Sequence, residues 1–321
     1  MRIGIVSTEF AGFDPLVNRP GPEARRIATA AERAGAEVLL IDPQQIYFTF
    51  GGGGRPRVLY AGGGPTDALE TLDALLVKRT RHMTEQIGDL VEALDAFQPA
   101  IEIFDPPGCY RRPTSKVDSY LLREREGLPH PLTLVGLSEE LDQANMILEP
   151  PVLMKPTHGT QGMGVKLLKT DVALANELRK VRFERSEIGP VDENYGVHLQ
   201  RHVDFDQEYR IFVIGGKAIG IAERVREAGW STGRQSSLPA ADFRGCSEDP
   251  AASALAERAA IVHGFSFAGV DVVRKGEELF LLECNRNPQF SKFEKAVELD
   301  VASMMVDFMI RKTSGSPIGE V

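Results

Sequence analysis

The stretch that most constrains this fold lies at residues 269–288 and reads GVDVVRKGEELFLLECNRNP. Two apolar runs flank a turn-forming segment, 275–278, and this pattern is typical of a β-hairpin. Position 277, inside the turn, is midway between Asp271 and Glu283. We therefore expect these two carboxylates to lie nearly opposite each other on neighbouring strands.

Strand geometry also predicts which side chains of the hairpin share a face. Glu283 and Asn285 are expected on one face of the second strand, with Leu282 and Cys284 on the other. Two carboxylates and an amide on one face are costly to bury unless a cation neutralises them. Mg²⁺ takes such oxygen ligands and shares the remainder with substrate phosphates, so one hypothesis is a Mg²⁺–nucleotide site. The alternative is an ordinary hairpin with a solvated polar face.

The length of 321 residues predicts two or three lobes rather than one core. The formal net charge of −9 argues against a nucleic-acid-binding coat and against binding to an anionic membrane surface. The three cysteines are widely spaced, which fits neither a disulfide framework nor a zinc cluster and is typical of a reducing cytosol. No run of about 18 apolar residues occurs, and the first residues do not form a signal peptide. We expect a cytoplasmic protein without nucleic-acid or membrane partners.

The N-terminal part predicts a parallel α/β lobe, residues 1–108, closed by the breaker Asp105-Pro106-Pro107-Gly108. A strand, a helix and a second strand follow in order, which implies parallel strand pairing. No GxGxxG motif follows the first strand, so the dinucleotide-binding fingerprint is absent. The glycine-rich stretch 46–64 predicts two strands joined by a flexible tip. The other expected elements are strands 3–6, 37–41, 73–77 and 100–104, and helices 22–34 and 84–96.

The remainder is assigned to two further lobes, residues 109–187 and 188–321, with a polar stretch near their boundary. The last helix carries a methionine cluster that we interpret as core packing. The expected helices are 116–127, 171–182, 250–264 and 296–311. The expected strands outside the hairpin are 152–155, 165–169, 197–203, 209–214 and 218–224.

A second informative stretch is the glycine-rich loop that follows Lys155. A lysine at a strand end, followed by glycines, can lay backbone N–H groups and one fixed cation over phosphates. The loop is not a Walker loop, because the lysine precedes the glycines, and not a Rossmann loop, because a strand follows it. A bare hairpin tip is the alternative, but the glycines then have an entropy cost without a packing return. The predicted phosphate contacts are Lys155, Gly159, Gln161, Gly162 and Gly164.

A third stretch, residues 200–210, links two expected strands and can present backbone groups to an adenine and a carboxylate to a ribose. The candidate residues are Gln200, Arg201, His202, Val203 and Asp206. Arginines follow at Arg210, Arg224 and Arg226, and guanidinium groups suit carboxylates and phosphates. A solvated basic face is the alternative for any one of them.

Together these stretches resemble the ATP-grasp superfamily and, within it, the RimK-like carboxylate–amine ligases of the glutathione synthetase and ribosomal-protein glutamate ligase type. The resemblance covers about residues 110–310 and implies an α/β ATP-grasp fold behind an N-terminal parallel-sheet βαβ domain. VLMKPTHGTQGMGV resembles the second phosphate lysine with its lid, and HLQRHVDFDQEYRIF resembles the hinge and the following sheet. GVDVV with LFLLECNRNP resembles the metal hairpin, and Lys116, before GLPHP, resembles the first phosphate lysine.

The resemblance implies roles for three groups of residues. The ligands of Mg²⁺ or Mn²⁺ would be Asp271, Glu283 and Asn285. The lysines on the phosphates of ATP would be Lys116 and Lys155. Arg224 and Arg210 would act catalytically, because they would hold the substrate carboxylate or stabilise the transferring phosphoryl group.

The reaction that the resemblance implies proceeds through an acyl phosphate. A substrate carboxylate attacks the γ-phosphate of ATP, and an amine then displaces phosphate to give an amide, ADP and phosphate. The expected partners are a small-molecule or peptide carboxylate and an amine, with an amino acid or peptide as substrate. The family also includes many homodimers and homotetramers.

Several positions depart from the family pattern. Ser115 stands where Asp usually precedes the first lysine, Arg201 where Glu follows the hinge Gln, and Glu208 where Asp precedes Arg210. The loop 226–237 lacks the family's Asn-Leu-His-Arg-Gly-Gly run, and the hairpin ends Asn-Pro-Gln-Phe rather than Pro-Gly. The nucleotide machinery therefore matches the family, whereas the acceptor side diverges.

Two rival functions come from other classes. An ATP-grasp kinase would phosphorylate a small molecule and stop, which would give ADP and a phosphorylated product without free phosphate. A nucleotide-binding regulatory protein without turnover would need a broken metal site, and the candidate ligands Asp271, Glu283 and Asn285 are all present.

Overall fold

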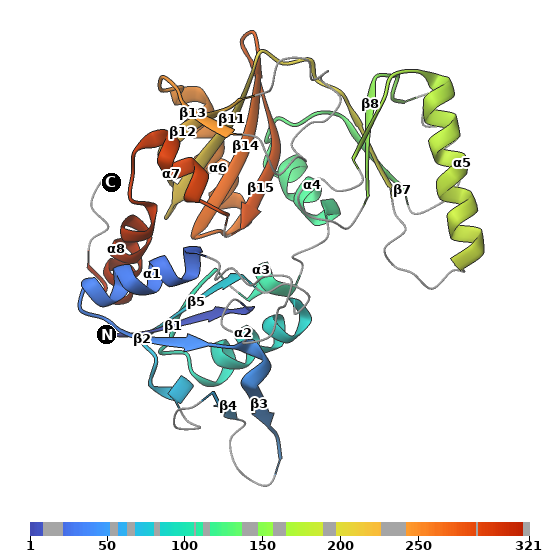
Figure 1. The fold of residues 1–321 in the computed structure, drawn as a ribbon. Helices are drawn as coiled ribbons and strands as arrows, with labels where there is room; N and C mark the ends of the chain where they lie inside the picture. The colour runs from blue at the N-terminus through green and yellow to red at the C-terminus, as the bar shows by residue number, and fades with distance from the viewer. Residues whose placement is uncertain are drawn as a thin grey trace.

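The computed structural model describes most of the chain, and Figure 1 shows how its elements are arranged. The described residues are 1–8, 22–51, 57–62, 68–79, 84–105, 107–111, 116–136, 147–156, 165–188, 197–225, 242–286 and 288–316. These residues form two four-stranded sheets, one five-stranded sheet and a two-stranded hairpin. The expected α/β class with a parallel N-terminal sheet is confirmed.

The N-terminal domain is built on a parallel sheet of order β2-β1-β5-β6. Side chains of β1 are buried on both faces, since Ile3 and Ile5 pack in the cluster that includes α1, and Val6 packs in the cluster that includes α2. Burial on both faces explains why the strands of this sheet have short, continuous apolar sequences. The elements are β1 (Arg2–Ser7), α1 (Pro22–Arg33), β2 (Glu37–Ile41), β5 (Ala74–Arg79), α2 (Thr84–Phe97) and β6 (Glu102–Phe104).

The glycine-rich stretch forms the expected antiparallel hairpin, β3 (Ile46–Thr49) with β4 (Arg57–Tyr60). It extends away from the rest of the molecule at the bottom of Figure 1. Its predicted tip, residues 52–56, lies outside the described part of the chain. Two short 3-10 helices flank the hairpin, η2 (Pro43–Gln45) and η3 (Ala68–Thr71).

A small antiparallel sheet of order β7-β10-β8-β9 forms a second unit, with α5 on one face. Its elements are β7 (Thr133–Gly136), β8 (Val152–Pro156), β9 (Lys166–Leu168), α5 (Asp171–Ile188) and β10 (Val197–Arg201). We expected the second lobe to end at residue 187, yet β10 pairs with both β7 and β8. A division after Arg201 would keep this sheet together.

A five-stranded antiparallel sheet of order β13-β12-β11-β14-β15 forms the centre of the third unit. Helix α6 packs on one face, whereas α7 and α8 cover part of the other. The strands are β11 (Gln207–Ile214), β12 (Lys217–Val225), β13 (Asp242–Gly245), β14 (Phe267–Lys275) and β15 (Glu278–Arg286). The helices are α6 (Pro250–His263), α7 (Ser291–Val297) and α8 (Val301–Thr313).

Helices α3 (Gly108–Arg111) and α4 (Lys116–Arg125) lead from the N-terminal domain toward the small sheet. Helix α4 lies between the two antiparallel sheets in Figure 1 and packs against α6. Arg123 Nη1 donates to Leu282 O at 3.2 Å, and Leu281 N donates to Pro129 O at 2.8 Å. Residues 116–129 therefore cover the outer edge of β15, which would otherwise present unpaired backbone groups.

The end of the chain differs from the single expected helix 296–311. The polypeptide turns at Glu298, which has φ = 56°, and a new helix begins after Asp300. The Asp300 side chain accepts from Ser303 N at 3.2 Å, which is a typical N-cap. Met305 and Met309 on α8 are buried in the core, as the methionine pattern predicts.

One hydrophobic core joins the first and third units. Side chains from β1, α1 and β6 share a cluster with side chains from β11, β14 and α8. At its centre the Phe104 ring lies 5.8 Å from that of Phe267 and 6.0 Å from that of Phe308, measured between centroids. Within the described ranges, no helix is both long and apolar enough to cross a membrane.

Candidate functional site

The pairing of β14 with β15 places the predicted metal ligands side by side. Asp271 lies directly opposite Glu283, and Gly269 lies opposite Asn285. The Asp271 side chain is buried whereas Glu283 is exposed, so the pair extends from the interior to the surface. The expected juxtaposition of the two carboxylates is confirmed, and their role as metal ligands stays a prediction.

A β-bulge in β15 changes the prediction for one neighbour. The register shifts between Asp271 and Val272, so Leu282 is an extra residue in the ladder. Cys284 packs on the α6 side of the sheet, as expected. The expectation that Leu282 shares that face is wrong, because a bulge moves the alternation by one residue. Leu282 instead belongs to an apolar group that we call the hinge cluster: Val203, Phe205, Val273, Phe280 and Leu282.

Two arginines converge on Asp271 from neighbouring strands. Arg210 Nη2 donates to Asp271 Oδ2 at 3.1 Å, and Arg210 Nε lies 2.8 Å from Oδ1, so the guanidinium group faces both carboxylate oxygens. Arg224 Nη2 lies 3.4 Å from Asp271 Oδ1, and Arg224 Nε lies 2.9 Å from Glu208 Oε1. The structure thus brings both predicted catalytic arginines to the buried carboxylate of the hairpin.

The charges in this network are strongly coupled. Burial raises the pKa of the Asp271 carboxyl, while Arg210 and Arg224 oppose that shift and Glu283 adds to it. Burial also acts to lower the pKa of Arg224, but attraction to Asp271 and Glu208 outweighs it, so the pKa of Arg224 is raised. When the carboxyl groups are ionised, the guanidinium groups balance Asp271 and Glu208. Glu283 then supplies an excess negative charge beside them.

The donor set fits a hard divalent cation. Carboxylate and amide oxygens are ligands that Mg²⁺ and Mn²⁺ prefer. The candidates Asp271, Glu283 and Asn285 include only two carboxylates, so a metal there would need further oxygens from a substrate. Among the residues that the structure describes, no group of three or more His, Cys, Asp or Glu side chains is placed to hold a metal by itself.

On the small sheet, Lys155 at the end of β8 is anchored by an amide. Its Nζ donates to Gln200 Oε1 at 2.7 Å, and Gln200 is only 1% exposed. Gln200 Nε2 in turn donates to Thr133 Oγ1 at 2.8 Å and to the Tyr120 hydroxyl at 3.4 Å. An amide oxygen orients the ammonium group without neutralising its charge. Gln200 therefore connects Lys155 to β7 and α4 through its side chain.

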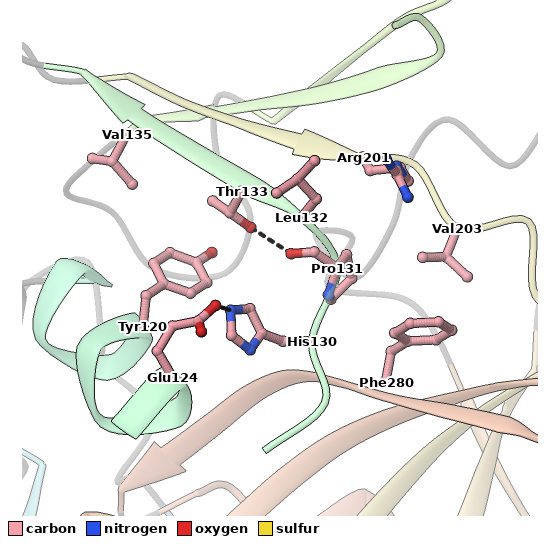
Figure 2. Close-up of a pocket in the computed structure, with 10 residues that line it drawn as sticks. All are labelled: Tyr120, Glu124, His130, Pro131, Leu132, Thr133, Val135, Arg201, Val203 and Phe280. Carbon is pink, nitrogen blue, oxygen red and sulfur yellow. Dashed lines mark hydrogen bonds and ion pairs between the residues drawn. The ribbon is translucent and has the colours of Figure 1, made fainter. Parts of the chain in front are cut away.

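A cavity of about 400 Å³ opens between α4, β7 and the hinge cluster. Figure 2 shows Tyr120 and His130 on one side of this space and Val203 with Phe280 on the other. His130 Nε2 lies 3.3 Å from Glu124 Oε1, a contact that holds the imidazole at the cavity wall. The predicted hinge residues Arg201 and Val203 both line the cavity. The lining residues are Tyr120, Glu124, His130, Pro131, Leu132, Thr133, Val135, Arg201, Val203 and Phe280.

Other predicted nucleotide contacts lie elsewhere or outside the described residues. His202 N donates to Pro151 O at 3.1 Å, which ties the hinge to the start of β8. Asp206 Oδ2 accepts from Gly276 N at 2.8 Å, in the turn between β14 and β15, so this contact supports the hairpin tip. Lys116 begins α4. The loop residues Gly159, Gln161, Gly162 and Gly164 lie outside the described part of the chain.

Glu208 is a site residue that sequence reasoning noticed only as a departure from a family pattern. It is buried on β11 and meets Arg224, whereas Asp206 is exposed. Side chains alternate between the two faces of a strand, and Glu208 and Arg210 are two positions apart on one strand. This alternation predicts that Glu208 lies on the same face as Arg210.

Comparison with known proteins identifies the family. Residues 114–309, more than half of the chain, match the model of the RimK-like ATP-grasp domain. The chain belongs to the RimK-like ATP-grasp family. A relative from Alcanivorax borkumensis, named "Probable alpha-L-glutamate ligase", is 27% identical over 294 residues, which cover 89% of this chain and 90% of that protein.

Solved structures show the same fold. A RimK domain ATP-grasp protein from Sphaerobacter thermophilus aligns with a TM-score of 0.68 and 20% identity, covering 97% of this chain and 100% of that one. The ATP-grasp ligase PsnB, complexed with a phosphomimetic variant of its minimal precursor, Mg and ADP, aligns with a TM-score of 0.66 and 18% identity, covering 97% and 98%. The predicted ATP-grasp fold and the expected class, an ATP-dependent ligase, are confirmed.

Proposed function

We propose that this RimK-like ATP-grasp protein is an ADP-forming ligase that joins an amino-acid or peptide carboxylate to an amine. The observation that carries the proposal is the convergence of Arg210 and Arg224 on Asp271, opposite Glu283. Together with a divalent cation bound beside Asp271 and Glu283, such a group can neutralise a polyphosphate and a carboxylate brought together for phosphoryl transfer.

The metal would be held by Asp271, Glu283 and Asn285, whose oxygens suit Mg²⁺ or Mn²⁺. When bound, such an ion neutralises charge on the phosphate oxygens of ATP. The arginines now bonded to Asp271 supply cationic charge at the same place. A divalent cation that arrives with ATP would neutralise part of the negative charge of Asp271. Arg224 and Arg210 could then contact the substrate carboxylate or the acyl phosphate.

The nucleotide would lie between the small sheet and the five-stranded sheet. Lys155, whose ammonium group is oriented by Gln200, would contact the phosphates. The cavity beside the hinge has about 400 Å³, within the range of small-molecule sites, and its apolar side includes Val203 and Phe280. Phe280 belongs with Leu282 to the hinge cluster, and Leu282 directly precedes Glu283. A base in this cavity would therefore place its phosphates toward the predicted metal ligands.

The substrate class rests on the relatives. Proteins named glutamate ligases align over nearly the whole chain, and PsnB has been solved in complex with a precursor peptide. Glutamate and a peptide both present a carboxylate and an amine on an amino-acid or peptide backbone. The alternative, a kinase that phosphorylates a small molecule, gains no support from these relatives. We further propose that the protein acts in the cytoplasm without nucleic acid.

The first experiment measures ADP, free phosphate and products by mass spectrometry, with panels of amino acids and peptides as carboxylates and amines. Equal release of ADP and phosphate with formation of an amide is expected. ADP without free phosphate, together with a stable phosphorylated product, would contradict the ligase assignment.

The metal assignment is tested with Glu283→Gln, which keeps the shape of the side chain and removes its charge. We expect turnover to fall by about 100-fold or more, because metal stabilisation of phosphoryl transfer is worth several kcal/mol. The matched control is Glu278→Gln, at an exposed position on the same strand near the turn. Normal nucleotide binding and turnover in Glu283→Gln would exclude Glu283 as a ligand.

A further inference from the structure

The segment that leaves the metal hairpin is held by two buried charged residues of the N-terminal domain. Lys78, at the end of β5, is 9% exposed, and its Nζ donates to Pro288 O at 2.7 Å. Glu23, in the first turn of α1, is 7% exposed, and its Oε2 lies 3.5 Å from Lys78 Nζ. The contact between Lys78 and Pro288 connects positions that are 210 residues apart in the sequence.

Glu23 also caps a helix that belongs to a different domain. Its Oε1 accepts from Phe290 N at 2.8 Å, from Ser291 N at 3.0 Å and from Ser291 Oγ at 2.9 Å. Helix α7 begins at Ser291, and its N-cap residue, Phe290, provides no side-chain cap. The carboxylate therefore satisfies backbone N–H groups that a local Ser or Asp satisfies in most helices.

The aromatic ring between these contacts fixes the same segment. Phe290 is fully buried, and the Lys78 ammonium lies 5.1 Å from its ring centroid. The Arg26 guanidinium lies 5.4 Å from the same ring, and the Phe212 ring packs edge-on at 6.4 Å. Phe290 stands in the run Asn-Pro-Gln-Phe, which departs from the family pattern. At this position Phe290 contacts both the N-terminal domain and the five-stranded sheet and so links the two.

A short chain of contacts leads from this link to the candidate site. Pro288 packs on Gly269, since a Cβ built on Gly269 would lie 2.5 Å from Pro288 Cβ. The same Cβ would lie 2.7 Å from Arg210 Nη1, so the Arg210 guanidinium passes over Gly269 beside Pro288. Gly269 is also the partner of Asn285 in the ladder. Lys78 therefore fixes the residue that packs on Gly269, next to the Arg210 guanidinium and at the end of the metal hairpin.

We propose that Glu23 and Lys78 are positioning residues for the metal and phosphate site, acting through Pro288 and the start of α7. This inference rests on the proposed function, because it assigns to the pair the placement of Asn285 and Arg210 for a nucleotide–metal complex. Neither residue touches the reacting atoms. Their effect is on the geometry of groups that do.

The variant Lys78→Met removes the contact with Pro288 and leaves the Glu23 carboxylate buried without its ion partner. Such a change is destabilising in itself. The double variant Glu23→Gln/Lys78→Met removes both charges and is expected to recover most of the melting temperature. The double variant still lacks the contact with Pro288. It therefore separates the effect on protein stability from the effect on the position of the site residues.

The measurement is Mn²⁺ affinity, by titration with electron paramagnetic resonance detection, in the presence of a non-hydrolysable ATP analogue. We expect about tenfold weaker Mn²⁺ binding in both variants, in line with the loss of residues that orient metal ligands. The control is Lys312→Met, which removes another contact between the same domains, Lys312 Nζ to Glu102 Oε1 at 2.9 Å, away from residues 288–291. Its Mn²⁺ affinity is expected to stay within twofold of the wild type.

The possible results distinguish the positioning role from the proposed function. Wild-type Mn²⁺ affinity in the double variant would overturn the positioning role and leave the proposed function intact. Wild-type protein that binds neither Mn²⁺ nor the analogue would overturn both. Equal loss of affinity in Lys312→Met would show that general loosening of the domain contact is responsible, which also overturns the inference.

Discussion

Gly269 shows how a single missing side chain shapes the candidate site. Arg210 reaches Asp271 by crossing the space that a Cβ of residue 269 would occupy. Pro288 Cβ would lie 2.5 Å from the same Cβ. A larger residue would have to displace the guanidinium, the proline or both, because neither approach leaves room for a normal contact.

For Gly269→Ala we expect kcat/KM to fall by about 10- to 100-fold, because small misplacements of catalytic groups are costly. Melting temperature and steady-state kinetics measure the effect. Gly220→Ala is the matched control, since a Cβ there would meet Leu299 and Phe293 at an ordinary 3.4 Å. Unchanged kinetics in Gly269→Ala would show that Arg210 does not need its present position.

Some residues of the site could be predicted because their positions follow from local rules. The opposition of Asp271 and Glu283 follows from the turn at its centre and from the alternation of strands. The contact of Lys155 with Gln200 could not be predicted in the same way, because it joins residues 45 positions apart across a ladder whose register the sequence does not specify. The Glu23–Lys78 contacts were missed for the same reason.

At the scale of elements, the sequence predicted most helices and strands and missed those with weak signals. Strands β7 and β13 have four residues each, too short for periodicity to stand out. The break between α7 and α8 does have a signal, since Asp300 precedes Ser303 in a capping arrangement. The bulge in β15 has none, because nothing in the run LFLLECN marks which residue is extra.

The bulge predicts different effects for two adjacent leucines. Leu281 packs in the core under α6, so Leu281→Ala should lower the free energy of unfolding by about 2–5 kcal/mol without a specific effect on ATP binding. Leu282→Ala removes a side chain from the hinge cluster and should weaken binding of the ATP analogue as well. Calorimetric titration and chemical denaturation measure both quantities. If the two variants bind the analogue equally well, the cluster does not contact the nucleotide.

At the scale of the whole molecule, the N-terminal domain and the five-stranded sheet share one core. Side chains of β6, β14 and α8 meet in the triad Phe104, Phe267 and Phe308. Because a shared core links their stabilities, we expect the two units to unfold together. The chain length predicted two or three lobes but held no information on which of them would share a core.

Phe308→Ala tests that linkage. We expect a loss of about 3–5 kcal/mol in the free energy of unfolding and one cooperative transition. Hydrogen exchange should increase in both β1 and β14, although the substituted residue lies in α8. Phe97→Ala, at a position that is 44% exposed, is the control and should change little. Loss of protection in β14 alone would show that the two units unfold independently.

The segment that forms the small sheet enters and leaves it at neighbouring points in space. Arg201 N, on the last residue of β10, donates to Leu132 O, just before β7, at 2.9 Å. The described residues between these positions form their own apolar cluster with α5. Residues 133–201 therefore have the character of a cassette inserted at a single junction. Exchange of such a cassette with that of a relative would have to match this junction, the contact of Gln200 with Tyr120 and the hydrogen bond from His202 N to Pro151 O. The small sheet could then change in evolution while the five-stranded sheet stays the same.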